Sequence, residues 1–78
     1  MTKKIMFGVL KCTVNVNEDK SADMELFDRT NGASLLVFVD KEGVVRFKET
    51  HAFKPITKKR NVQKALAKCF NEYDKVVA

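Results

Sequence analysis

The chain has 78 residues, of which 45% are apolar and 32% charged, and its formal net charge is +5. This composition is typical of an ordinary globular domain and excludes a disordered chain, while the length predicts one domain over residues 1–78 with a small core. Such a core leaves little room for a large catalytic cleft, so the length favours binding over catalysis. Two cysteines do not make a disulfide framework, and one histidine outside any Cys/His cluster predicts neither a metal site nor a cofactor.

Membrane insertion and secretion are not expected. The apolar run Ile5–Leu10 has six residues. The apolar core of a secretion signal needs about 7–15 residues, and a membrane span needs about 20. We therefore expect a soluble cytoplasmic protein without a membrane partner.

Residues 5–16 are predicted to form the first strand. Every second residue from Met6 to Val16 is apolar or small, and polar side chains alternate with them toward the end of the segment. The first half is also apolar at Ile5, Phe7 and Val9. Both faces of this half then need cover, which indicates contact with another chain, either a second copy in a homodimer or a target protein. A polar loop over residues 17–21 follows.

Three further strands are separated by turn signals. Residues 22–26 alternate between apolar and acidic side chains, and the pair Asn31-Gly32 is typical of a tight hairpin because both residues tolerate positive φ. Residues 35–39 are a continuous apolar run, as in a central strand, and a turn over residues 40–43 precedes the fourth strand, 44–48. Four phenylalanines are assigned to the core: Phe7, Phe38, Phe47 and Phe70.

Beyond Pro55 the apolar residues follow the period of a helix. They recur every three or four residues and form one stripe that faces the core. The stripe comprises Val62, Leu66, Cys69, Tyr73 and Val76. Thr57 or Asn61 is the predicted N-cap. The order of elements predicts an α+β fold of the type ββββα, with a four-stranded antiparallel sheet and one C-terminal helix packed on one face.

Both cysteines are predicted to be buried, reduced thiols. Cys12 lies on the first strand and Cys69 on the apolar stripe of the helix. Free cysteine behaves as a small apolar residue and is among the residue types most often buried. Whether the two thiols are close to one another does not follow from the pattern.

Residues 50–71 contain no acidic side chain, although they hold six of the 15 Lys and Arg residues and the only histidine. The rest of the chain carries nine basic and ten acidic groups, a net charge of −1. The excess positive charge is therefore local, and a local field of one sign indicates an anionic partner. We term the six cations the basic segment and predict that they bind nucleic acid: Lys54, Lys58, Lys59, Arg60, Lys64 and Lys68.

Three cations of this segment, Lys58, Lys59 and Arg60, lie at the predicted start of the helix. Cations there oppose the helix dipole, at a cost of about 0.3–1 kcal/mol each when exposed, and stability alone would favour acidic residues. The free backbone N–H groups of the same helix end can bind phosphate. Phosphate binding is therefore the leading interpretation. A solvated loop and a nuclear import signal are the alternatives.

Lys64, Lys68 and Lys75 extend the positive charge along the outward face of the helix. A stripe of one sign suits a row of phosphates, because releasing condensed counterions drives much of nucleic-acid binding. Only Lys68 has an oppositely charged residue, Glu72, four positions further along. RNA or single-stranded DNA is the expected partner.

The polar face of the sheet is a second candidate surface. Phe27 shares the parity of Asp23 and Glu25. Single-strand-binding proteins stack bases on an exposed aromatic side chain that is surrounded by cations. The candidate contacts on this face are Phe27, Arg46, Lys48 and Lys11. The two acidic residues nearby add negative charge to the same face.

Together these patterns predict a small non-catalytic protein that binds RNA or single-stranded DNA. His51 is the one acid–base candidate, with Glu49 on the same face, but neither a nucleophile cluster nor a glycine-rich phosphate loop accompanies it. We therefore predict no catalytic residue. The alternative function is inhibition or regulation of another protein, such as a nuclease, with or without bound RNA, as in counter-defence or antitoxin-like proteins.

Overall fold

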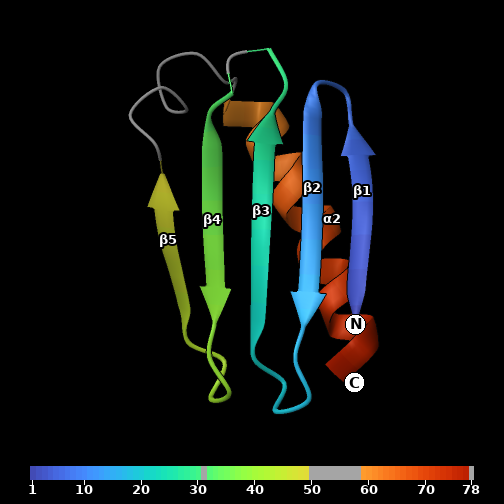
Figure 1. Cartoon of the computed structure of the whole chain (residues 1–78), viewed down its shortest axis with the longest axis vertical. Coiled ribbons are helices and arrows are strands. Elements are labelled where there is room, and N and C mark those ends of the chain that lie inside the picture. The colour runs from blue at the N-terminus through green and yellow to red at the C-terminus, as the bar shows by residue number, and fades with distance from the viewer. Residues whose placement is uncertain (31, 50–58, 78) are drawn as a thin grey trace.

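The protein forms one antiparallel sheet of five strands followed by one helix (Figure 1). The structure is a computed structural model, and it describes residues 1–30, 32–49 and 59–77. The elements are β1 (Thr2–Phe7), β2 (Leu10–Val16), β3 (Ala22–Asp28), β4 (Ser34–Val39), β5 (Val45–Glu49) and α2 (Lys59–Val77). Strands that follow one another in the chain are neighbours in the sheet, so the topology is a meander. The predicted α+β class and the C-terminal helix are confirmed, whereas the predicted number of four strands is wrong.

The additional strand arises because residues 5–16 fold back on themselves at Gly8 and Val9. Gly8 has a φ of +60°, and the backbone of Val9 remains on the negative side. Glycine at the first central position is characteristic of the two-residue type II′ turn, whose twist matches that of the flanking strands. The turn pairs Phe7 with Leu10, and antiparallel pairing continues along both strands. The predicted single strand is therefore a hairpin of β1 and β2.

This hairpin also changes which apolar residues need cover. The register places Ile5 opposite Cys12, so Ile5 and Phe7 lie on the same face as the buried residues of β2. Met6 points to the other face and is 53% exposed, and Val9 is exposed in the turn. The prediction of one strand that is apolar on both faces is therefore wrong for this region.

The core lies between one face of the sheet and α2. Buried side chains alternate along β2, β3 and β4, as strands with one covered face require. The buried apolar residues of these three strands and of α2 are Leu10, Cys12, Val14, Val16, Ala22, Met24, Leu26, Leu35, Val37, Val39, Ala65 and Cys69. The helix packs mainly on β1, β2 and β3. It lies behind the sheet in Figure 1, and the front face of the sheet, which we term the open face, has no helix over it.

Cys12 of β2 and Cys69 of α2 meet in this core. Both are fully buried, which confirms the predicted burial, and both are free. Hydrogen bonding between the two thiols shifts the pKa of each. This interaction lowers the pKa of Cys12, and together with burial it raises the pKa of Cys69. The pair links the helix to the sheet at the centre of the core.

Two of the four phenylalanines assigned to the core are exposed instead. Phe38 is 41% exposed on the open face, where it pairs across the sheet with Arg46. Phe47 is on the helix side of β5 but is 56% exposed, because α2 packs mainly on the first three strands. Phe7 and Phe70 pack against the core as predicted.

The predicted turns connect the strands, with one difference in length. Gly43, with a φ of +85°, ends the turn between β4 and β5, and the Asp40 carboxylate accepts hydrogen bonds from the backbone N–H groups of Glu42 and Val44. The hairpin signal at residues 31–32 does connect β3 and β4. However, the connection runs over residues 29–33 rather than through a two-residue turn, and Asn31 lies outside the described residues.

Candidate nucleic-acid interface

The structure describes the helical part of the basic segment. The helix begins at Lys59, and its first turn contains no acidic residue. The N-cap predicted at Asn61 is therefore wrong, because the helix has already begun there. Of Lys59 only the backbone is described. Four other predicted positions lie outside the described residues: His51, Lys54, Thr57 and Lys58.

Arg60, Lys64 and Lys68 form an exposed row along α2, which we term the helical basic stripe. Each residue is about one turn from the next, or roughly 6 Å along the helix axis. The buried residues Ala65 and Cys69 fall on the face of the helix that packs against the sheet. Among the side chains that the structure describes, no carboxylate lies within ion-pair distance of these three cations. The stripe therefore presents unneutralised positive charge to solvent.

Contact with the sheet positions the last cation of the stripe. The Nζ atom of Lys68 lies 5.5 Å from the centroid of the Phe7 ring. At this distance the ammonium group is attracted to the negative face of the ring, a cation–π interaction. Phe7 is itself half-buried against the core. Lys68 is thus held toward β1, and the ion pair that its spacing to Glu72 suggests is not formed.

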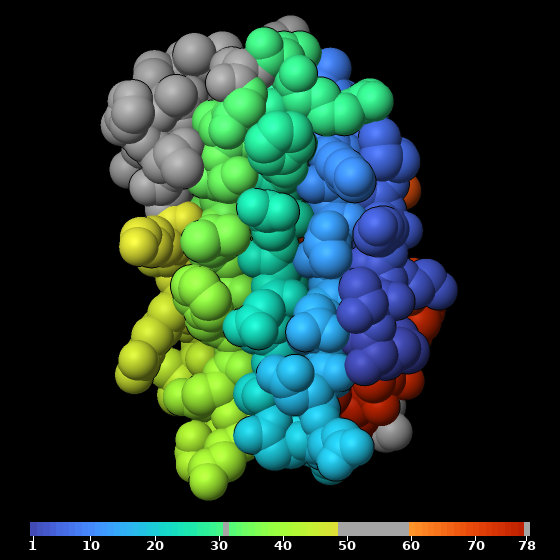
Figure 2. Space-filling model, in the orientation of Figure 1, coloured from blue at the N-terminus to red at the C-terminus, as the bar shows by residue number. Residues whose placement is uncertain are grey.

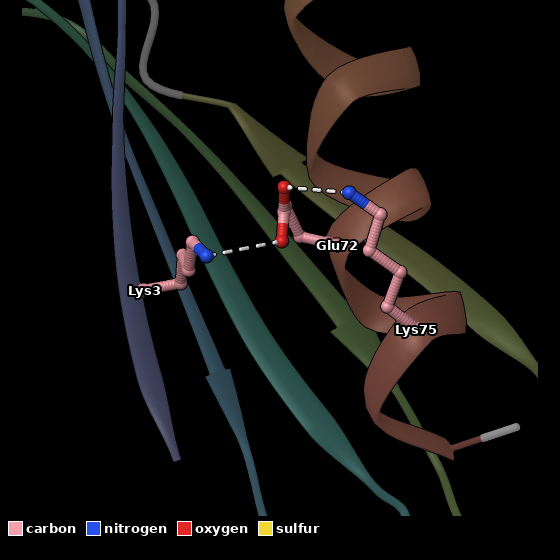
Figure 3. A network of polar contacts seen from close by, with 3 residues as sticks. All are labelled: Lys3, Glu72 and Lys75. Atoms are coloured by element: carbon pink, nitrogen blue, oxygen red, sulfur yellow. Dashed lines mark hydrogen bonds and ion pairs between the residues drawn. The ribbon is translucent and has the colours of Figure 1, made fainter.

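Glu72 instead connects α2 to the first strand (Figure 3). Its carboxylate lies 3.5 Å from the Nζ atom of Lys3 and 3.4 Å from that of Lys75. Partial burial raises the pKa of Glu72, but attraction to the two ammonium groups outweighs this effect and holds the pKa below its ordinary value. Because Lys75 is paired, the unpaired cations described on the helix lie in its first half. Sequence patterns did not identify Lys3 as a partner of Glu72, since no periodicity relates the first strand to the helix.

Charge is also segregated between the two ends of the sheet. The first half of α2 lies at the same end as the β1–β2 and β3–β4 turns (Figure 1). Arg29 lies at this end, and its guanidinium donates a hydrogen bond to the carbonyl oxygen of Gly8 at 3.0 Å. The loops at the opposite end carry four acidic residues against two lysines: Glu18, Asp19, Asp40, Glu42, Lys20 and Lys41. The described loops at the end opposite the stripe therefore carry net negative charge.

The open face gathers the second group of predicted contacts on one surface. The strand register places Lys11 opposite the half-buried Phe27, and it places Arg46 and Lys48 opposite apolar residues of β4. Figure 2 shows this face covered by the side chains of the five strands, with the helix visible only at the margin. Phe38 also belongs to this surface, although its apolar surroundings in the sequence indicated a core position.

Two further observations concern alternative kinds of site. Across the described ranges, no three His, Cys, Asp or Glu side chains are grouped so that they could hold a metal ion. In the same part of the chain, no helix is long and apolar enough to cross a membrane. No protein-family model, curated protein or solved structure shows significant similarity to this chain.

Proposed function

We propose that this protein is a small, non-catalytic, cytoplasmic protein that binds RNA or single-stranded DNA through the basic segment. The observation that supports this function is the helical basic stripe, three exposed cations in line on one helix. None of them has a carboxylate partner in the described part of the chain. Phosphates that bind such a row release condensed counterions, and this release supplies most of the affinity of non-specific binding.

The dimensions of the stripe favour a single strand. From Arg60 to Lys68 the row is about 12 Å long, since the helix rises 1.5 Å per residue. This length matches a few successive phosphates of one extended strand. Lys54, Lys58 and Lys59 precede the stripe in the sequence and belong to the proposed contact. The expected complex is therefore short, weakly dependent on base sequence and strongly dependent on salt.

A matched pair of variants tests the stripe. In the stripe variant, Lys64→Gln and Lys68→Gln remove two cations; in the control, Lys20→Gln and Lys41→Gln remove two exposed lysines from the opposite end of the molecule. Both variants lose the same net charge. Affinity for labelled single-stranded RNA, single-stranded DNA and duplex DNA is measured over a range of salt concentrations.

The stripe variant should bind more weakly, and its slope of log K against log salt should flatten by about 0.7 for each phosphate of a single strand that the variant no longer neutralises. The control should retain the slope of the unmodified protein. Equal reductions of affinity in both variants would mean that net charge, rather than the stripe, determines binding. Unchanged affinity in the stripe variant would exclude this site.

A second candidate function, inhibition or regulation of another protein such as a nuclease, is favoured by exposed apolar residues on the edge strand β5 and directly before it. Val44 is 50% exposed, Val45 38% and Phe47 56%. Exposed apolar side chains can mark protein–protein interfaces, and β5 is an edge strand whose outer side can pair with another chain. This function becomes the preferred one if the salt titrations detect no nucleic-acid binding.

A further inference from the structure

Two neighbouring rows of side chains on the open face have the same pattern. Each row has an acidic residue on β3, an apolar residue on β4 and a basic residue on β5. The rows are Asp23–Phe38–Arg46 and Glu25–Leu36–Lys48. They run side by side across the sheet, because their members are separated by two residues along each strand.

The charges within a row are too far apart to neutralise each other. The acidic and basic residues are separated by β4, or about 10 Å at the usual spacing between strands. All four charged side chains are exposed, and none belongs to an ion pair within the described residues. Between them lie Phe38, which is 41% exposed, and the half-buried Leu36. The surface thus has an apolar centre with negative charge on one side and positive charge on the other.

This arrangement is complementary to itself under two-fold symmetry. A two-fold axis that runs along β4, between two open faces, places β3 of one copy over β5 of the other and preserves the direction of the strands. Each row then faces the same row in reverse order. Asp23 faces the second copy's Arg46, Glu25 faces the second copy's Lys48, and Phe38 faces its own counterpart. A symmetric dimer requires a self-complementary patch of this kind.

We propose that the open face is the interface of a symmetric homodimer. The charge pattern favours a second copy over a nucleic acid, because Asp23 and Glu25 lie beside the apolar residues on which bases would stack and would repel phosphates. In the dimer the same carboxylates face cations. Two aligned sheets cross at about −30°, so the rows remain opposed at the centre of the contact.

The size of the patch indicates a weak dimer. The outermost positions of the patch are about 10 Å apart across the three strands and about 7 Å apart along them, so the patch covers far less than the roughly 800 Å² per partner of a standard interface. The dimer should therefore dissociate on dilution. This inference concerns a surface distinct from the helical basic stripe, so the homodimer and the nucleic-acid function can fail independently.

Complementary charge reversals test the arrangement. One variant carries Asp23→Arg and Glu25→Lys, and the other carries Arg46→Asp and Lys48→Glu. Alone, each variant places like charges opposite one another in both rows of the dimer. In a mixture, the cations introduced at positions 23 and 25 of one variant face the carboxylates introduced at positions 46 and 48 of the other. The unchanged charges of the two variants also face each other, so the heterodimer has opposite charges in every row. All four positions are exposed, and circular dichroism checks that each variant is folded.

Sedimentation equilibrium without nucleic acid, from low micromolar to millimolar protein, gives the association constants. The unmodified protein should dimerise, each variant alone should associate at least ten-fold more weakly, and an equimolar mixture should recover association. A strict monomer, variants that dimerise like the unmodified protein, or a mixture that stays monomeric would each overturn the proposal. Binding of single-stranded RNA that is lost on Phe38→Ser, in a protein that stays monomeric, would assign the open face to nucleic acid instead.

Discussion

The tight turn at Gly8 can be tested by replacing Gly8 with L-alanine and, separately, with D-alanine. Gly8 adopts a φ of +60°, a conformation that L-residues disfavour and D-residues favour. A Cβ atom built at Gly8 meets no heavy atom within 4 Å, so a steric clash does not contribute for L-alanine. The effect of Gly8→Ala is therefore a backbone effect alone.

The magnitude follows from two terms. An L-residue in the left-handed region lowers the free energy of unfolding by about 1–2 kcal/mol. Replacing glycine by alanine also restricts the unfolded chain, which raises the free energy of unfolding by about 0.4–1 kcal/mol. L-alanine should therefore destabilise the fold by about 1 kcal/mol, and D-alanine should leave stability unchanged or raise it by up to about 1 kcal/mol. The two alanines restrict the unfolded chain equally, so their difference, about 1–2 kcal/mol, isolates the cost of the left-handed backbone.

Cys12 makes this experiment accessible, because a synthetic peptide of residues 1–11 can be ligated to residues 12–78 at that cysteine. Urea unfolding and the melting temperature report the stabilities, with a shift of about 4–8 °C expected per kcal/mol for a domain of this size. The control, Val9→Ala at an exposed position with negative φ, should change stability by less than about 0.5 kcal/mol. If D-alanine at position 8 destabilised as much as L-alanine, the turn would be refuted and one continuous strand would be restored.

Two further predictions concern the open face and the contact between α2 and β1. Measured by urea unfolding at high dilution, Leu26→Ala should cost about 3–5 kcal/mol and Phe38→Ala only about 1–2 kcal/mol, because Leu26 is fully buried whereas Phe38 is 41% exposed; equal costs would place Phe38 in the core. Because Lys3 and Lys75 lower the pKa of Glu72 in the folded protein, its carboxylate stabilises the fold at neutral pH, and this contribution is lost as the pH falls from the ordinary value of 4.5 through the folded pKa. Glu72→Gln should therefore be less stable than the unmodified protein at pH 7 and equally stable in acid, and a difference that persisted in acid would contradict the ion pairs.

The α+β class, with antiparallel strands followed by a C-terminal helix, and the parity of the core could be read from the sequence because the underlying patterns are local. Alternation of apolar residues along β2, β3 and β4 and the three-to-four-residue spacing in α2 each require only short windows. Burial of both cysteines followed from their positions in these patterns. The local excess of positive charge was likewise a property of one segment, and part of it forms the exposed helical basic stripe.

Where the chain reverses or loses cover was decided by tertiary structure. The alternation around Gly8 is equally compatible with one strand or two, and only pairing between β1 and β2 distinguishes them. Phe38 and Phe47 have neighbours like those of core residues, but α2 packs mainly on β1 to β3 and leaves β5 and the open face uncovered. Apolar periodicity shows that one face of the sheet needs to be buried. The area of the sheet on which the helix packs determines how much of that face is buried.

The charge contacts depend even more on the fold. Glu72 has Lys68 at a favourable helical spacing, yet it pairs with Lys3 from the first strand, while Lys68 lies over Phe7. Likewise, the acidic, apolar and basic rows of the open face combine residues from three strands. Sequence patterns specify each charge and the face of the element on which it lies. Which charges meet depends on strand register and helix placement, since electrostatic interactions act through distances that only the packed chain defines.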